Sequence, residues 1–316
     1  MGTPNPDRAK QDVYAQRDQC PCCGAHRSGA ERAVASTPTA ESLRPAQHGA
    51  FLSGFDSARI FFTYYRCTDC EALYCPVYYS GPQLEQLYAR QSENMSDTPL
   101  VARLRTHERY ADIVARYSRL SGDFLEIGSD VGLFAELLAR RGTFDRFWLY
   151  EPNREVHAQL ANRLRSYNCT IRHTGYRAAD IPAGSVSTAG MIHVLDHLFE
   201  PARLLRDLRQ TLEPEGVLFI VTHDATSLLA RVLGRRWPPY TLQHPHLFSP
   251  RALRLLLESC GYKGVEIVKT QTYMPLSYLL RAGLSTLGLP SAFLPNSSHG
   301  LLTLPLGNIA AVARNR

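Results

Sequence analysis

The chain has 316 residues and a formal net charge of +6; 44% of its residues are hydrophobic and 20% are charged. This composition fits an ordinary globular protein that can bury one full core and a smaller one, and it argues against a membrane-spanning protein. The longest apolar tract, residues 274–294, is interrupted by Arg281, Gly283, Gly288 and Pro290, which makes it a poor membrane span.

Residues 1–19 are polar and charged and contain no apolar core. We expect them to form a disordered tail without a secretory signal, and we therefore expect a cytoplasmic protein. In that setting the eight cysteines are metal ligands or free thiols rather than a disulfide framework.

Residues 20–79 hold six of the eight cysteines among short aromatic runs, which predicts a small β-rich module. Two Cys-x-x-Cys pairs supply four thiolates, the ligand set of a structural zinc ion: Cys20, Cys23, Cys67 and Cys70. Gly24 follows the first pair and allows a tight turn around a metal. Cys22 or His26 could replace one ligand, and the alternative is a set of reduced cysteines in an aromatic core. Because the module is too short to be stable on apolar burial alone, we favour zinc.

Residues 80–120 carry leucines and tyrosines at helical spacings, which predicts a helical connector. From residue 121 to residue 316, predicted strands alternate with helices. The strands are 124–127, 147–150, 169–173, 186–193, 217–222, 265–269 and 308–313, and the helices are 133–140, 156–164, 202–212 and 250–259. Residues 213–216 are a predicted turn. This order predicts an α/β fold, a Rossmann-like, mostly parallel seven-stranded sheet with helices on both faces.

The turn after the first predicted strand is the most informative segment. Glu126 ends that strand, and Gly128 and Gly132 lie in the turn that leads into its helix. Glu151 ends the second strand, where a carboxylate can accept hydrogen bonds from ribose hydroxyls. The two features together indicate an adenosine-containing cofactor. Because the turn lacks the Gly-x-Gly-x-x-Gly spacing and Asp130 would repel a diphosphate, S-adenosylmethionine is favoured over a dinucleotide.

The order of motifs resembles the class I S-adenosylmethionine-dependent methyltransferases over about residues 121–270. The matching segments are Glu126-x-Gly128-x-x-x-Gly132, Glu151-Pro152-Asn153, Ile192-His193-Val194-Leu195-Asp196-His197 and Leu212-Glu213-Pro214-Glu215-Gly216. Together with the cysteine pairs, the chain looks like the zinc-bearing branch that includes deoxysugar C-methyltransferases. The resemblance implies that the cofactor is bound by Glu126, Gly128, Gly132, Glu151 and His193, with Asp180 as a candidate contact to adenine.

A methyl acceptor that must lose a proton needs a base, and histidine titrates near neutrality. The candidates are Tyr240, His244 and His246, on the loop after the fifth predicted strand, and His223, which directly follows that strand. In an open α/β sheet this edge carries the ligand crevice. Alternatively, His244 and His246 pack against the next helix or cap it. Residues 235–240 could form a substrate lid whose arginines meet a phosphate or carboxylate, or an exposed loop.

We therefore expect a methyltransferase that acts on a small molecule, with a carbon of a nucleotide-linked sugar as the leading acceptor and another natural-product intermediate next. The arginine-rich helices leave an RNA base methyltransferase as an alternative, although solvated helix faces explain them better. Asp130 motivates a third alternative, a domain that binds cofactor without turnover. We expect no nucleic-acid or membrane partner. Residues 274–294 could be a lid, core, or the surface of a homodimer.

Overall fold

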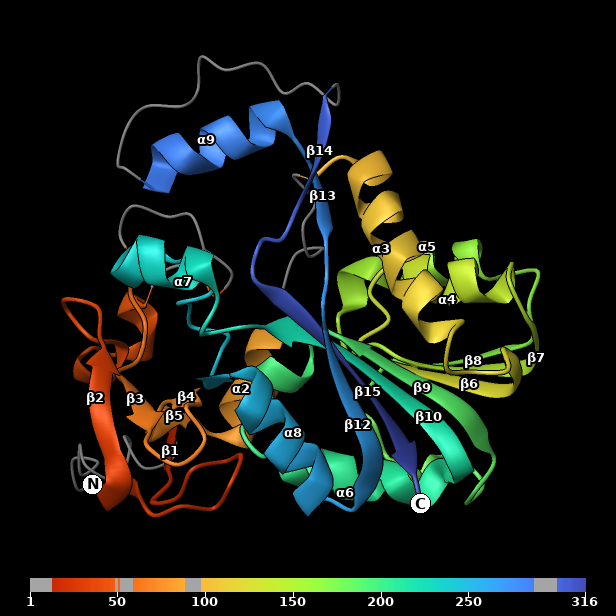
Figure 1. Ribbon diagram of the computed structural model, residues 1–316, viewed down its shortest axis with the longest axis horizontal. Coiled ribbons are helices and arrows are strands. Elements are labelled where there is room, and N and C mark those ends of the chain that lie inside the picture. The colour runs from red at the N-terminus through yellow and green to blue at the C-terminus, as the bar shows by residue number, and fades with distance from the viewer. Residues whose placement is uncertain (1–12, 49–50, 52–58, 89–97, 287–299) are drawn as a thin grey trace, which may run out of the picture.

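The computed structural model describes residues 13–48, 51, 59–88, 98–286 and 300–316. Its centre is a seven-stranded sheet in the order β12-β15-β10-β9-β6-β7-β8 (Figure 1). The strands are β6 (Ser121–Ile127), β7 (Thr143–Tyr150), β8 (Cys169–Arg172), β9 (Val186–Ile192), β10 (Leu212–His223), β12 (Tyr262–Lys269) and β15 (Asn308–Asn315). Neighbours from β8 to β10 pair in parallel, whereas β15 is antiparallel to both β10 and β12. The predicted Rossmann-like sheet is confirmed.

Helices cover both faces of this sheet because its strands alternate their apolar side chains between them. Phe124 and Phe219 point to the face covered by α3 (Leu100–Val114), α4 (Leu133–Ala139) and α5 (His157–Arg163). Leu125 and Leu218 point to the opposite face, which is covered by α6 (Pro201–Thr211) and α8 (Pro250–Ser259). Figure 1 shows these two helical layers on either side of the sheet.

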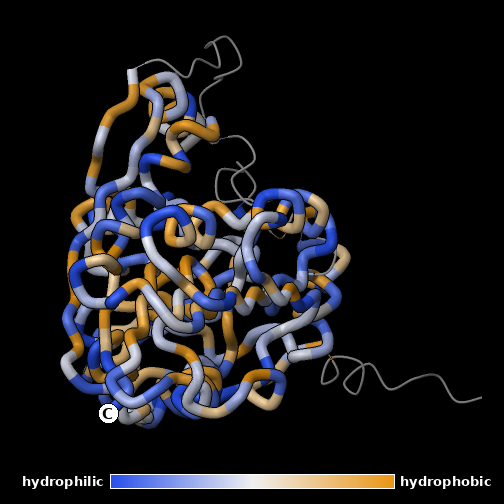
Figure 2. Tube along the Cα trace, turned by 90° about the vertical axis from the view of Figure 1, so that its right-hand side faces the viewer, coloured by the Kyte–Doolittle hydropathy of each residue, from blue (hydrophilic) through white to orange (hydrophobic). Residues whose placement is uncertain are grey.

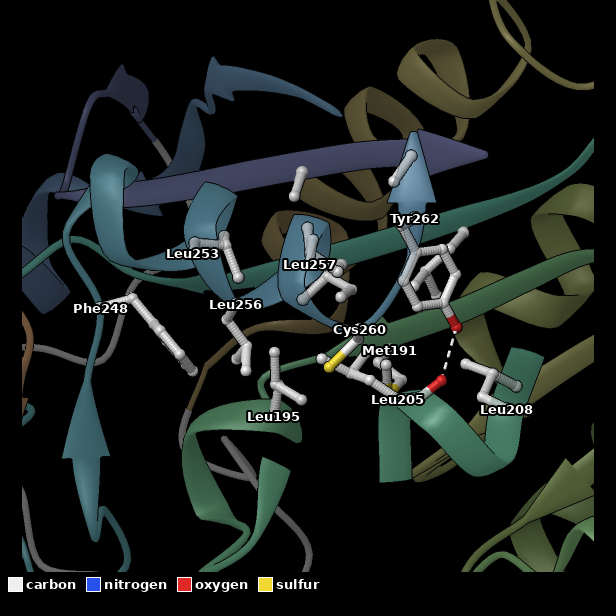
Figure 3. Close-up of a cluster of buried hydrophobic side chains, with 14 of the residues drawn as sticks. Met191, Leu195, Leu205, Leu208, Phe248, Leu253, Leu256, Leu257, Cys260 and Tyr262 are labelled. Carbon is white, nitrogen blue, oxygen red and sulfur yellow. Dashed lines mark hydrogen bonds between the residues drawn. The ribbon is translucent and has the colours of Figure 1, made fainter. Parts of the chain in front are cut away.

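The second face has a continuous apolar contact between α6, α8 and the strands (Figure 3). Leu205 on α6 and Leu253, Leu256 and Leu257 on α8 are each no more than 1% exposed. The hydroxyl of Tyr262, in β12, donates to the carbonyl of Leu205 at 2.9 Å, so the one polar atom of that ring is satisfied within the core.

The N-terminal module lies beside the carboxyl edge of the large sheet (Figure 1). It contains β1 (Tyr14–Gln16), β2 (Ala30–Val34), β3 (Tyr64–Cys67), β4 (Leu73–Tyr74), β5 (Val77–Tyr79) and α2 (Gly81–Tyr88). β1 pairs with β5, so the prediction that all of residues 1–19 form a disordered tail is wrong for Tyr14–Gln16. A short strand from the other domain, β11 (His246–Leu247), completes the module's sheet by pairing with β4.

One other segment differs from its prediction, and the tract 274–294, for which the sequence left a lid, core and a dimer surface open, is described in part. β10 already begins at Leu212, and the predicted turn 213–216 is an irregularity within this strand between its pairings at Leu212 and Val217. The tract 274–294 contributes to β13 (Thr272–Pro275) and α9 (Leu276–Thr286), and β13 pairs with β14 (Leu301–Leu304). Residues 287–294 of the tract lie outside the described residues. α9, β13 and β14 project from the body in Figures 1 and 2. Within the described ranges, no helix has the length and apolarity needed to cross a bilayer.

Candidate cofactor and active site

The turn between β6 and α4 has backbone conformations that explain its glycines. Gly128 has φ of 75° and Gly132 has φ of 77°, values that favour glycine. A Cβ on Gly128 would lie 2.4 Å from Cγ2 of Val194, and one on Gly132 would lie 2.7 Å from Cδ1 of Leu160. Asp130 also has a positive φ, 44°, which aspartate tolerates better than most residues. The turn therefore accommodates an aspartate at position 130.

Glu151 ties this turn to the end of β7. Its Oε2 accepts a hydrogen bond from the amide of Asp130 at 2.8 Å, and its Oε1 accepts one from the amide of Asn153 at 2.8 Å. The carboxylate thus fixes two loops, and each oxygen keeps a second lone pair that can accept from a ligand. Glu151 is buried, and burial raises its pKa, although both amides oppose this shift.

Glu126 is a third acidic side chain close to Asp130 and Glu151. Its side chain is only 2% exposed, and its Oε2 has no hydrogen-bond partner among the described residues. Burial raises the pKa of Glu126 well above its usual range, and the charges of Asp130 and Glu151 raise it further. A cationic ligand would relieve this repulsion. S-adenosylmethionine carries a sulfonium and an ammonium group, so the carboxylates fit that cofactor and not a diphosphate.

The remaining predicted cofactor residues flank this acidic turn. Asp180 accepts a hydrogen bond from the hydroxyl of Tyr150 at 3.5 Å, which places it beside the end of β7. His193 follows β9 with φ of 52°, and its amide donates to the carbonyl of Val221. A left-handed backbone conformation costs free energy for any residue other than glycine, and such residues are frequent at functional sites.

A histidine and an aspartate form a close pair at the same edge. Nδ1 of His223 lies 2.8 Å from Oδ2 of Asp196, whose side chain is fully buried. Because a carboxylate only accepts, Nδ1 carries the proton, and the neutral ring leaves Nε2 as an acceptor. Burial, followed by repulsion from His193, lowers the pKa of His223, although Asp196 opposes this shift. Burial raises the pKa of Asp196, but the nearby imidazole of His193, whose Nδ1 lies 3.9 Å from Oδ2, and the hydrogen bond from His223 outweigh it and hold that pKa well below its usual range.

The other three predicted catalytic side chains are more enclosed. Nδ1 of His244 donates to the carbonyl of Pro239 at 2.7 Å, so its Nε2 accepts from Nε2 of His197 at 3.2 Å. His246 lies in β11 and is fully buried, and its Nε2 donates to the carbonyl of Leu195 at 3.0 Å. Tyr240 is buried in an aromatic cluster that also contains Phe61, Tyr64 and Trp237. His223 is 21% exposed and is the most accessible of the four.

The N-terminal module holds the loop that carries these residues. The hydroxyl of Tyr64 donates to the carbonyl of His244 at 2.5 Å, and the hydroxyl of Tyr78 donates to that of Leu242 at 2.6 Å. The amide of Cys75 donates to the carbonyl of Pro245 at 2.8 Å. Neither this interface nor the contact between His223 and Asp196 was predicted from the sequence. The only available signal was the run of tyrosines in the module, since buried tyrosines need hydrogen-bond acceptors.

The two Cys-x-x-Cys pairs come together as predicted. Sγ of Cys20 lies 3.6 Å from that of Cys70, and Sγ of Cys23 lies 3.5 Å from that of Cys67. All four ligand atoms lie within 4.8 Å of one another, and tetrahedral zinc with Zn–S bonds of about 2.3 Å requires S···S separations of about 3.8 Å. Cys22 is buried beside the cluster, whereas His26 is exposed and caps a short 3-10 turn.

Both pairs have the same backbone geometry. The amide of Gly24 donates to the carbonyl of Cys20, and the amide of Glu71 donates to that of Cys67, each at 3.0 Å. Gly24 and Glu71 both have a positive φ. No disulfide joins any of the eight cysteines. Each of the two turns thus directs the thiols of its own Cys-x-x-Cys pair toward the other pair.

Comparisons with known proteins agree with this fold. The sequence model of the family described as methyltransferase domain matches residues 102–267, just over half of the chain. No curated protein matches the chain. A chain of a Haloferax volcanii complex that contains the methyltransferase activator Trm112 is similar, with a TM-score of 0.50 and 12% identity over 74% of this chain and 97% of that one.

Two further solved structures are similar at lower scores. A Thermotoga maritima SAM-dependent methyltransferase, described as a possible histamine N-methyltransferase, has a TM-score of 0.46 and 16% identity over 69% of this chain and 92% of its own. The phosphoethanolamine N-methyltransferase 2 of Haemonchus contortus has a TM-score of 0.43 and 14% identity over 65% of this chain and 52% of its own. The chain belongs to the methyltransferase domain family and is an S-adenosylmethionine-dependent methyltransferase of class I fold.

Proposed function

We propose that this methyltransferase acts on a carbon or hydroxyl of a small molecule, with His223 as the general base. The observation that carries the proposal is the 2.8 Å contact between Nδ1 of His223 and the buried carboxylate of Asp196. Asp196 fixes the ring and its tautomer, and it stabilises the imidazolium that forms when Nε2 takes a proton. Such positioned proton transfer contributes roughly 10²- to 10⁴-fold to a rate.

The cofactor supplies a methyl group on a positive sulfur, which a nucleophile can displace in line. We assign the ribose hydroxyls to Glu151 and the acidic environment of the sulfonium to Glu126. Gly128 and Gly132 leave the backbone of the turn accessible, His193 borders the methionine portion, and Asp180 lies on the adenine side. These residues bind and orient the cofactor, and they leave proton removal from the acceptor to His223.

The buried side chains around His223 favour a small acceptor. Trp237 is only 1% exposed, and its ring lies edge-on to that of His223 with centroids 6.2 Å apart. His244 packs against the other side of His223 at 5.1 Å. Because His244 uses both ring nitrogens in hydrogen bonds, we assign it to the wall of the acceptor site. A carbon of a nucleotide-linked sugar remains the leading acceptor, on the resemblance to deoxysugar C-methyltransferases.

We propose that Cys20, Cys23, Cys67 and Cys70 bind a structural zinc ion. Four thiolates leave no coordination position for water, so the metal would take no part in methyl transfer. Its role would be to stabilise a module whose strands are only two to five residues long.

The test begins with calorimetric titration of S-adenosylmethionine into the protein. Methyl transfer from labelled cofactor to a panel of nucleotide-linked keto sugars, phenols and short RNAs then identifies the acceptor class. His223→Gln is expected to lower kcat by roughly 10²-fold or more and to leave cofactor affinity unchanged, and Asp196→Asn is expected to lower kcat and shift the pH profile. Full activity of His223→Gln would eliminate this base, and failure to bind the cofactor would overturn the proposed function as a whole.

A further inference from the structure

The exposed apolar side chains of the protein gather on four elements. Among the described residues, the exposed large hydrophobic side chains all lie on α3, α7 (Leu228–Leu233), α9 and β14. They are Leu100, Val101, Leu228, Val232, Leu276, Leu280 and Leu302. The four elements lie in the upper half of Figure 1, and we call this set of side chains the apolar end. Single exposed apolar side chains are normal on a protein surface, whereas a concentration of them indicates a contact surface.

Two of these elements carry their exposed side chains in pairs. On α7, Leu228 is 77% exposed and Val232 is 73% exposed. On α9, Leu276 is 48% exposed and Leu280 is 50% exposed. Residues four apart in a helix lie on the same face, so each helix turns an apolar stripe outward. A partner that covers these stripes would remove them from water, which is favourable.

Hydrogen bonds join these elements to one another and to the body. The amide of Tyr273, in β13, donates to Oγ1 of Thr106, in α3, at 2.9 Å, and β13 pairs with β14 and leads into α9. The amide of Asp224 donates to the carbonyl of Gly307 at 2.7 Å, and a Cβ on Gly307 would lie 2.6 Å from Oγ of Ser227, the residue that caps α7. The apolar end is therefore built from neighbouring elements.

The charges near the apolar end are positive. Arg231, in α7, is exposed, and so are Arg235 and Arg236 in the turn that follows. The sequence has no aspartate or glutamate from residue 225 to residue 257 or from residue 267 to residue 316, so α7, α9, β13 and β14 carry no acidic side chain. An anionic partner fits this charge. A second copy of the chain, docked through the same surface, would bring like charges together.

We propose that the apolar end binds the surface of a membrane that contains anionic lipids. Figures 1 and 2 show that α9, β13 and β14 project from the body. Projecting apolar side chains can enter the head-group region of a bilayer, and neighbouring arginines add attraction to anionic head groups. The protein would lie on the membrane and would not span it.

This proposal goes beyond the proposed function, because it concerns where the enzyme works and leaves the cofactor and the base as assigned. It also departs from the expectation of no membrane partner that we drew from the sequence. The exposed side chains come from four separate segments, and they form one surface only in the folded protein.

Co-sedimentation of the full chain with lipid vesicles tests the proposal. We expect binding to vesicles of phosphatidylcholine mixed with phosphatidylserine, weaker binding to phosphatidylcholine alone, and an affinity for the mixed vesicles that falls with salt. Two double variants remove the apolar stripes, Leu228→Ser with Val232→Ser on α7 and Leu276→Ser with Leu280→Ser on α9. Each should weaken binding to the mixed vesicles roughly tenfold or more.

A pair of single variants tests the charge. Arg231→Gln should weaken binding to the mixed vesicles roughly fivefold. The matched control is Arg203→Gln, on α6, whose side chain is 78% exposed and which lies near the bottom of Figure 1. It should bind the vesicles as the wild type does.

The outcomes separate this proposal from the proposed function. Weaker vesicle binding in both double variants, with unchanged Tm and unchanged methyl transfer in the absence of vesicles, supports the proposal. Absence of binding to either kind of vesicle, equal binding to both kinds, or equal binding by wild type and variants would overturn it, and normal methyl transfer in the same samples would leave the proposed function intact. If analytical ultracentrifugation showed a dimer that the α7 double variant dissociates, the apolar end would be an interface between copies and the proposal would be wrong.

Discussion

Replacement of Glu151 by glutamine gives a quantitative test of the cofactor site. Each carboxylate oxygen accepts a backbone amide at 2.8 Å, one from Asp130 and one from Asn153. Glutamine is neutral, so a ribose hydroxyl that donates to the carboxylate would lose a charged hydrogen bond. Its NH₂ group would also face one of the two backbone amides. A hydrogen bond to a charged group contributes about 1.5–3 kcal/mol. We therefore expect Glu151→Gln to weaken binding of S-adenosylmethionine roughly 10- to 150-fold.

Isothermal titration with S-adenosylmethionine and S-adenosylhomocysteine measures this effect. Both ligands should be affected alike, because the ribose is common to them. The matched control is Glu155→Gln, which removes an exposed carboxylate from the turn that follows and should leave both affinities unchanged. Thermal melting of the unliganded variant separates loss of the loop from loss of binding. An affinity of Glu151→Gln within twofold of the wild type would refute the assignment of this carboxylate to the cofactor.

Three further predictions concern the unliganded protein. Burial lowers the pKa of His197 to about 4 and that of His246 to about 3, so both stay neutral in the folded state and gain a proton on unfolding below about pH 6.5. The free energy of unfolding should therefore fall as the pH drops from about 6.5 toward 4, by up to about 1.4 kcal/mol per pH unit for each histidine. Urea melts at several pH values should show that this free energy depends less steeply on pH in His246→Gln than in the wild type. An equal dependence on pH would contradict the lowered pKa of His246. Cys67→Ser should release zinc, measured by elemental analysis, and lower the Tm, whereas Cys169→Ser, outside the module, should do neither. Because the folded pKa of Glu126 is raised, its contribution to stability is lost as the pH rises through that pKa. Glu126→Gln should be more stable than the wild type at alkaline pH and bind S-adenosylmethionine more weakly. Reduced stability of Glu126→Gln at alkaline pH would count against a destabilising buried charge at this position.

Local patterns were sufficient to predict the large sheet. Continuous apolar runs such as residues 124–127 fill both faces at once, and the structure uses Phe124 on one face and Leu125 on the other. The cofactor turn was also predictable, because Gly128 and Gly132 have conformations and close contacts that only glycine satisfies. The clustering of the four cysteines could also be predicted, because each Cys-x-x-Cys pair forms its own local turn.

Contacts between distant segments could not be predicted. β11 has two residues, and its pairing with β4 has no period that a sequence pattern could reveal. The same holds for Tyr14–Gln16, whose polar neighbours suggested a tail although the strand finds a partner in β5. His223 is the last residue of β10 and Asp196 lies in the 3-10 turn Leu195–His197 that follows β9, so the two side chains meet only because β9 and β10 are neighbours in the sheet. Spacing along the chain carries no information about that distance.

Ser249 links the cysteine cluster to the start of α8. Its Oγ accepts the amide of Ala252 at 2.9 Å, which caps the start of α8, and it donates to the carbonyl of Cys70 at 2.7 Å. A thiol cluster that lost its geometry would therefore disturb the start of α8 as well as the pairing of β11 with β4. His246 lies in β11, and His244 shortly precedes it in the sequence. A module joined to the domain through its cysteine turns is better suited to form a wall of a small-molecule site than to bind RNA as an independent unit.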